Sequence, residues 1–222
     1  MNVIYYLVPV VAIVGMLLYT KWAQANVRKR AAAGEGPQMF HEAYAEKFEV
    51  LNPDERLIGI WMGLAYVTPT NTVGQVAGKL AKEAALGVVG MSTYTPTVYV
   101  GLTTQGRVLV SEEYSDMGQR NNFKVVSAFG PGAQVVTGRE ASPEHQGSPP
   151  RNPYSADAPL ELVRLVGPNE QYLCWLTGAG AMTGASTFVS ISSVLPITPE
   201  RASNVWQQAS RPAPAQVAAP LL

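Results

Sequence analysis

The sequence predicts a mainly β fold: one N-terminal transmembrane helix, then a small bent antiparallel sheet or open barrel with a C-terminal helix and a helical insertion. Three observations lead to this fold class. Residues 3–19 carry no charge and are almost wholly apolar. Seven or more short runs rich in β-branched and aromatic residues follow residue 55, separated by turn residues. After the last run, Thr198 and Pro199 are typical of the start of a helix.

The apolar stretch has the length and the flanking residues of a membrane anchor. A helix needs about 20 apolar residues to cross a bilayer core of roughly 30 Å, and amphipathic aromatic rings prefer the headgroup zone. The predicted anchor residues are Tyr5, Tyr6, Pro9, Tyr19 and Trp22. We expect the cationic side chains that follow to contact lipid headgroups: Lys21, Arg28, Lys29 and Arg30.

Cationic residues flank the apolar stretch on its C-terminal side only, which predicts the topology of the chain. The N-terminus is expected outside and the C-terminal domain in the cytoplasm, in a single-pass protein of the bacterial inner membrane. A cleaved signal peptide is the alternative, because Ala23, Gln24 and Ala25 have the small-residue pattern of a cleavage site. A signal peptide carries its cationic residues before the apolar stretch, which favours the anchor.

Composition and charge exclude some classes of function. Charged residues make up 14% of the chain, against about 25% in ordinary soluble proteins, so we expect lipid or another protein to cover part of the surface. The first 30 residues hold four cationic and no acidic side chains, which leaves 12 basic and 16 acidic ones in the remainder. A body with a net charge of about −4 argues against nucleic-acid binding.

The chain divides into four segments. Residues 1–33 form the anchor and a basic juxtamembrane helix, which Gly34 and Pro37 end. Residues 34–50 form a linker helix with an apolar stripe of Phe40, Tyr44 and Phe48. Residues 51–210 form the β-rich domain, and residues 211–222 form an extended tail.

Strands are predicted wherever β-rich runs lie between turn residues. The predicted strands are 56–67, 98–103, 107–111, 123–129, 133–137, 160–166, 171–176 and 188–194. Residues 104–106 are expected to be a hairpin turn. Residues 139–159 are rich in Pro, Ser, Gly and Ala and are predicted to be a long surface loop. The final helix is expected to end near residue 210.

Residues 73–89 predict a helix inserted between the first two strands. Its apolar side carries mostly small residues, which permit close approach to a neighbouring surface. The predicted partner interface consists of Val73, Val76, Ala77, Leu80, Ala81 and Ala84. The alternative is that this helix caps an open end of the barrel.

Two stretches carry a resemblance to a known family. In residues 51–61, Glu55 and Arg56 precede an apolar run, and in residues 99–110, Thr103 ends one strand and Arg107 begins the next. This order resembles bacterial pleckstrin-homology-like domains of the GRAM type over residues 48–210, interrupted by 72–90 and 139–159. The resemblance implies the fold and either a protein-interaction or a lipid-binding role. The hairpins depart from the family in having no basic headgroup pocket.

Residues capable of catalysis or metal binding are sparse. His41 lacks a second histidine four residues on, as a zinc helix requires, and is expected to be a solvated helix residue. His145 lies in the Pro-rich loop. Cys174, the single cysteine, stands in an apolar run and is expected to be buried. The acidic residues Glu112, Glu113 and Asp116 form a solvated turn or, as the alternative, a weak divalent-cation site.

These observations predict a non-catalytic, membrane-anchored accessory or scaffold subunit of a larger membrane complex. Its cytoplasmic β domain is expected to bind partner subunits, and its anchor the lipid bilayer. The alternative is a lipid-sensing or regulatory module at the membrane surface. We expect no enzyme activity, no catalytic residue, no metal, no cofactor, no nucleic acid and no small-molecule substrate.

Overall fold

The computed structural model describes residues 4–66, 96–114, 122–143, 149–153, 158–184 and 188–212. Within them the chain is mainly β. An eight-stranded antiparallel sheet has the order β4-β3-β2-β1-β7-β6-β5, and β8 pairs with β1 beside this path. The strands are β1 Leu57–Ala65, β2 Thr97–Thr103, β3 Val108–Tyr114, β4 Asn122–Phe129, β5 Gln134–Thr137, β6 Leu160–Val166, β7 Gln171–Thr177 and β8 Ala181–Met182.

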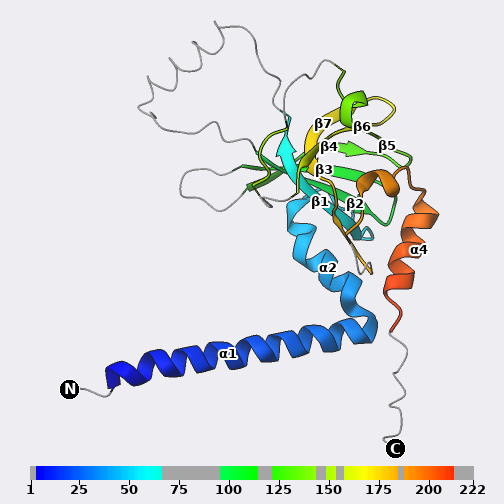
Figure 1. Ribbon diagram of the computed structural model, residues 1–222. Helices are drawn as coiled ribbons and strands as arrows, with labels where there is room; N and C mark the ends of the chain where they lie inside the picture. Colours follow the sequence, from blue (N-terminus) through cyan, green and yellow to red (C-terminus); the bar gives the residue numbers. More distant parts are fainter. Residues whose placement is uncertain are drawn as a thin grey trace, which may run out of the picture.

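Helices lie at both ends of this order (Figure 1). Before the sheet come α1 Ile4–Arg30, the π-helical turn η1 Ala31–Glu35, α2 Gly36–Tyr44 and the 3-10 turn η2 Ala45–Lys47. Further 3-10 turns are η3 Gly138–Glu140 and η4 Ile191–Ser193, and the last helix is α4 Pro199–Ala209. The Thr198 hydroxyl accepts a hydrogen bond from the Arg201 backbone N–H, so the predicted cap of the C-terminal helix is confirmed.

The predicted transmembrane anchor and membrane location are wrong. Among the helices that the structure describes, none has an apolar stretch long enough to cross a bilayer.

Helix α1 ends at a sharp change of direction (Figure 1). Gly34 in η1 has a φ of 84°, in the left-handed region that favours glycine. A side chain at this position would collide with the backbone carbonyl oxygen of Ser210, just after α4. The glycine therefore permits both the turn and a close contact between the two ends of the domain.

The inner face of the sheet carries the main core. Side chains alternate along each strand, and one set packs together with residues of η4 and α4. Its fully buried members include Ile58, Trp61, Val100, Val110, Leu165, Cys174, Leu176, Ile191 and Ala202. The indole N–H of Trp61 donates a hydrogen bond to the Val189 carbonyl oxygen at 2.8 Å, which attaches the segment before η4 to the core.

The outer face of the sheet is covered in two places. Over β1–β3, Phe48 packs with Leu57, Ile60 and Leu109, and α2 adds partly buried aromatic residues. A Cβ atom on Gly101 would lie 2.7 Å from the Phe48 ring, so this glycine makes room for Phe48. Over β6 and β7, a second cluster contains Ala141, Leu160, Leu162 and Trp175.

Two predicted elements differ from the observed ones. The predicted strand 188–194 is wrong, because Val189 makes one isolated bridge with Gly180 and the chain then turns into η4. The 3-10 turn Ile191–Ser193 takes the place of the strand, and its first residue, Ile191, is buried in the core. The predicted surface loop 139–159 contains buried residues, since Ala141 joins the outer cluster and Asn152 donates a hydrogen bond to the Ala158 carbonyl oxygen.

Candidate functional site

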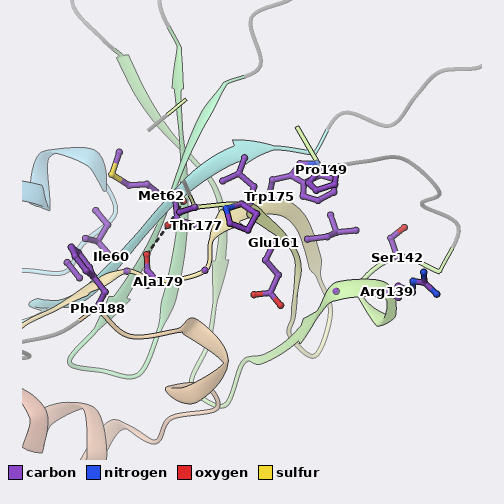
Figure 2. Close-up of a pocket in the computed structure, with 18 of the residues that line it drawn as sticks. Ile60, Met62, Arg139, Ser142, Pro149, Glu161, Trp175, Thr177, Ala179 and Phe188 are labelled. Atoms are coloured by element: carbon purple, nitrogen blue, oxygen red, sulfur yellow. Dashed lines mark hydrogen bonds between the residues drawn. The ribbon is translucent and has the colours of Figure 1, made fainter. Parts of the chain in front are cut away.

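An apolar groove of about 1280 Å³ lies on the outer face of the sheet, between its two covered regions (Figure 2). Several chain segments that are far apart in sequence contribute to it. The lining residues are Tyr44, Ile60, Met62, Gly138, Arg139, Ser142, Pro143, Pro149, Ala158, Pro159, Leu160, Glu161, Leu162, Trp175, Thr177, Gly178, Ala179, Gly180, Ala181 and Phe188. Strands β1, β6 and β7 provide many of the apolar ones.

Strand alternation presents the lining side chains to the outer face. Ile60 and Met62 are two residues apart on β1, as are Trp175 and Thr177 on β7, so each pair shares one face. The Thr177 hydroxyl lies 3.0 Å from the Met62 carbonyl oxygen and 2.9 Å from that of Ala179, and shares its proton between them. This hydrogen bonding fixes the turn after β7 against β1.

Three aromatic side chains line different parts of the groove. Phe188 is 77% exposed, which leaves a large apolar ring in solvent beside Ile60 (Figure 2). Trp175 is buried at the centre, and its ring lies 6.3 Å from that of Tyr66 at the end of β1. Tyr44, from the last turn of α2, adds a ring on the side nearest the helices.

Two charged side chains interrupt the apolar lining. Glu161 of β6 lies in the middle of the groove, and Arg139 of η3 lies at the end farthest from Phe188 (Figure 2). Within the described part of the chain, neither side chain has a hydrogen-bond or ion-pair partner. The groove therefore offers one acidic and one basic group to an occupant.

His41 is not the solvated residue that the sequence predicted. Its Nδ1 atom accepts a hydrogen bond from the Leu57 backbone N–H at 3.2 Å. Its ring meets Trp206 of α4 edge-on, with centroids 6.5 Å apart. Burial lowers the pKa of His41, the Arg56 guanidinium lowers it further, and Glu42 opposes both.

Cys174, Glu112 and Glu113 are held by burial and by hydrogen bonds within the fold. Cys174 is fully buried as predicted, and burial followed by the charge of Glu112 raises the pKa of its thiol far above the ordinary value. Glu112 accepts a hydrogen bond from the Tyr172 hydroxyl at 2.6 Å, and Glu113 accepts one from the Tyr99 hydroxyl at 2.8 Å.

Glu112 and Glu113 therefore do not form the single acidic cluster that the sequence predicted. Glu112 and Glu113 are neighbours on β3 and point to opposite faces of the sheet. Asp116 lies outside the described residues. In the described ranges, no group of three or more His, Cys, Asp or Glu residues is arranged to hold a metal ion.

The predicted anchor and headgroup residues fall on α1. Tyr19 and Trp22 are exposed, with ring centroids 6.0 Å apart, and the side chains of Tyr5, Tyr6 and Pro9 lie outside the described residues. Arg30 forms ion pairs with Glu35 at 2.6 Å and Glu42 at 3.6 Å. The other three headgroup residues, Lys21, Arg28 and Lys29, are exposed on α1.

The predicted partner interface on residues 73–84 lies outside the described residues, as does the rest of the helical insertion. Sequence reasoning did not identify the groove that the structure shows instead. Its residues come from five or more separate stretches, so no local spacing marks it. The available signal was the conspicuous Phe188 after the glycine-rich stretch 178–184.

No protein-family model, curated protein or solved structure matches this chain. The resemblance to pleckstrin-homology-like domains therefore stays a prediction, and the geometry of the groove is the basis for assigning a function.

Proposed function

We propose that this protein is a non-catalytic interaction module whose outer-face groove binds an extended segment of a partner protein. The observation that carries this proposal is the open apolar groove with its exposed Phe188 ring. Large apolar side chains left in solvent beside a concave surface are typical of sites that another molecule covers. An accessory or scaffold role was also the prediction from the sequence.

The size of the groove favours a polypeptide as its occupant. Small-molecule sites usually enclose about 300–1,000 Å³, and this groove, at about 1280 Å³, exceeds that range while remaining open to solvent. An extended peptide can place successive apolar side chains against Phe188, Ile60 and Trp175. Binding of this kind is dominated by a few aromatic contacts.

The charges of the groove specify the occupant further. Glu161 is only partly exposed and forms no ion pair with the described residues, so a Lys or Arg of the peptide would complete an ion pair there. Arg139, at the exposed end, would accept an acidic residue. We therefore commit to an apolar segment with a basic residue in its middle and an acidic residue toward one end.

The chemistry of the lining supports binding rather than catalysis. Its titratable side chains are Tyr44, Arg139 and Glu161, and no hydrogen bond in the described part of the chain joins two of them. A catalytic nucleophile is activated by an adjacent base, by a lowered pKa or by a metal ion. The arrangement supplies apolar contact and charge selection but no activated group.

A phage-displayed library of random 12-residue peptides tests this function on the full chain. We expect enrichment of apolar peptides with a central Lys or Arg. Phe188→Ala should lower the affinity for the selected peptides about tenfold, which corresponds to a loss of about 1.4 kcal/mol of binding free energy. Glu161→Lys should reverse the preference for a basic residue.

Val50→Ala is the matched control, because Val50 is an exposed apolar residue outside the groove and its loss should not change binding. Peptides that bind Phe188→Ala and Glu161→Lys as tightly as the unmodified protein would refute the groove as the site. Binding of a long-chain fatty acid, with no enriched peptide, would favour a lipid-binding module instead.

A further inference from the structure

We propose that His41 is a pH-dependent latch, whose neutral ring fastens α2 to β1 and α4 and whose protonation at Nδ1 loosens α2 from the sheet. Two contacts within the described residues meet at this side chain of α2: the Leu57 amide at the start of β1 and the Trp206 ring of α4.

The hydrogen bond from Leu57 makes the latch sensitive to protonation. Leu57 is fully buried, and its N–H donates to the Nδ1 lone pair of His41. A protonated Nδ1 carries a hydrogen and can no longer accept. Protonation would thus leave a buried backbone N–H without its acceptor and place two donors against each other, an arrangement that folded proteins avoid.

The charged groups around His41 do not reverse the lowering of its pKa by burial. From the turn before β1, the Arg56 guanidinium disfavours a second positive charge, and from α2, Glu42 favours one. Glu42 is itself engaged with Gln38 and with Arg30. Helix α4 presents the uncharged Trp206 ring, and its nearest charged residues, Glu200, Arg201 and Arg211, each lie more than one helical turn away along the chain.

The direction of the pH effect follows from these contacts. The ordinary pKa of histidine is 6.5, and the pKa of His41 in the folded protein is lower. The unfolded or opened state therefore binds more protons than the closed state at mildly acidic pH. The stabilisation by neutral His41 is complete above pH 6.5 and is lost as the pH falls from 6.5 toward the folded pKa.

The loosened helix would also change the groove, a step that rests on the proposed function. Tyr44 follows His41 by three residues on α2 and lines the groove. Residues three apart lie on neighbouring positions of one helix face. A helix that leaves β1 at low pH would therefore withdraw an aromatic residue from the groove wall and weaken peptide binding.

Hydrogen exchange of the full chain at pH 7.5 and 5.5, corrected for intrinsic rates, tests the latch. We expect the protection of the α2 amides and of the Leu57 amide to fall severalfold, and by at most about tenfold, since the ordinary pKa is 6.5. Amides of β6 and β7 should keep their protection. Unchanged α2 protection between the two pH values would overturn the proposal.

Two variants separate the titration from the packing. His41→Asn keeps an acceptor oxygen on Cγ, where His41 has Nδ1, but does not titrate, so α2 protection should become independent of pH. His145→Asn, at the other histidine, should retain the pH dependence of the unmodified chain. An undiminished pH response in His41→Asn would refute the latch.

Imidazole nitrogen NMR of the unmodified protein gives a measurement that needs no variant. At pH 7.5, Nδ1 of His41 should be the unprotonated nitrogen, and its titration should coincide with the loss of α2 protection. A protonated Nδ1 at that pH would contradict the latch. Weaker peptide binding at pH 5.5 than at pH 7.5 would support the link between the latch and the groove. A groove that binds no peptide at either pH would refute the proposed function, and the hydrogen-exchange result would then decide the latch alone.

Discussion

At the scale of single residues, a buried ion pair joins the start of β1 to the β2–β3 hairpin. Glu55 is completely buried, and its Oε2 atom lies 2.7 Å from Nη1 of Arg107. The same oxygen accepts a hydrogen bond from the Asn52 backbone N–H at 3.2 Å. The Arg107 side chain remains 23% exposed, so Glu55 depends on this partner more than Arg107 depends on Glu55.

We predict that Arg107→Leu lowers the free energy of unfolding by roughly 3–5 kcal/mol, because it leaves a buried carboxylate without its counter-charge. The double variant Glu55→Leu with Arg107→Leu should lose less free energy of unfolding than Arg107→Leu alone, because it also removes the buried charge. Urea unfolding of both variants provides the comparison. A double variant less stable than Arg107→Leu would contradict the assignment.

At the scale of elements, the contact between β2 and η2 determines how the helical segment lies on the sheet. Phe48 follows η2 and is buried above Gly101 in the middle of β2. Lys47 adds to this contact, with its Nζ atom 4.5 Å from the ring centroid of Tyr99 and 4.0 Å from that of Phe123. Gly101 is therefore part of the surface against which Phe48 packs.

We predict that Gly101→Ala destabilises the protein by about 1–3 kcal/mol, as is usual when a filled core receives an extra methyl group. Gly130→Ala is the control, because a Cβ atom there meets no other atom within 4 Å. Thermal unfolding of the two variants should separate them. Equal stabilities would show that Phe48 moves aside without cost.

The elements also show how far the sequence could predict this protein. Most strands followed from runs of β-branched residues between turn residues. Their observed bounds agree within two residues, except that β3 extends three residues beyond its predicted end. The run 188–194 has the same composition, but Trp61 holds Val189 from a distant strand and the chain then fills one end of the core. Composition could not reveal that tertiary contact.

The groove and the latch were unpredictable for a similar reason. Glu161, Arg139 and Phe188 come together only when β6, η3 and the segment after β8 are in place. His41 pairs with an amide 16 positions further along the chain, a partner that its helical neighbours do not indicate. The apolar composition of the N-terminal segment, in contrast, predicted a membrane location that is wrong.

At the scale of the whole molecule, Gly34 connects the beginning and the end of the domain. It lies at the bend between α1 and α2 and directly against Ser210 after α4 (Figure 1). We predict that Gly34→Ala lowers the free energy of unfolding by about 1–3 kcal/mol, from left-handed strain and the lost contact. Chemical denaturation measures this loss.

Gly36→Ala is the matched comparison for that variant. Gly36 has a helical φ of −50°, and a Cβ atom at this position would meet no other atom within 4 Å. Alanine there should leave stability unchanged or raise it by up to about 1 kcal/mol. A Gly34→Ala protein as stable as Gly36→Ala would show that the junction adapts freely.

This junction gives the molecule a mechanical property. Helix α1 contains 27 residues, so it is a stiff rod of about 40 Å that pivots at Gly34. A sideways load on its far end becomes a torque at the pivot, magnified by the length of the rod. Gly34 lies directly against Ser210, so the load passes into the end of α4 as well as into α2, which continues the chain toward β1. Strain applied to α1 thus reaches both the C-terminal end of the domain and, through the hydrogen bond between His41 and Leu57, the first strand of the sheet.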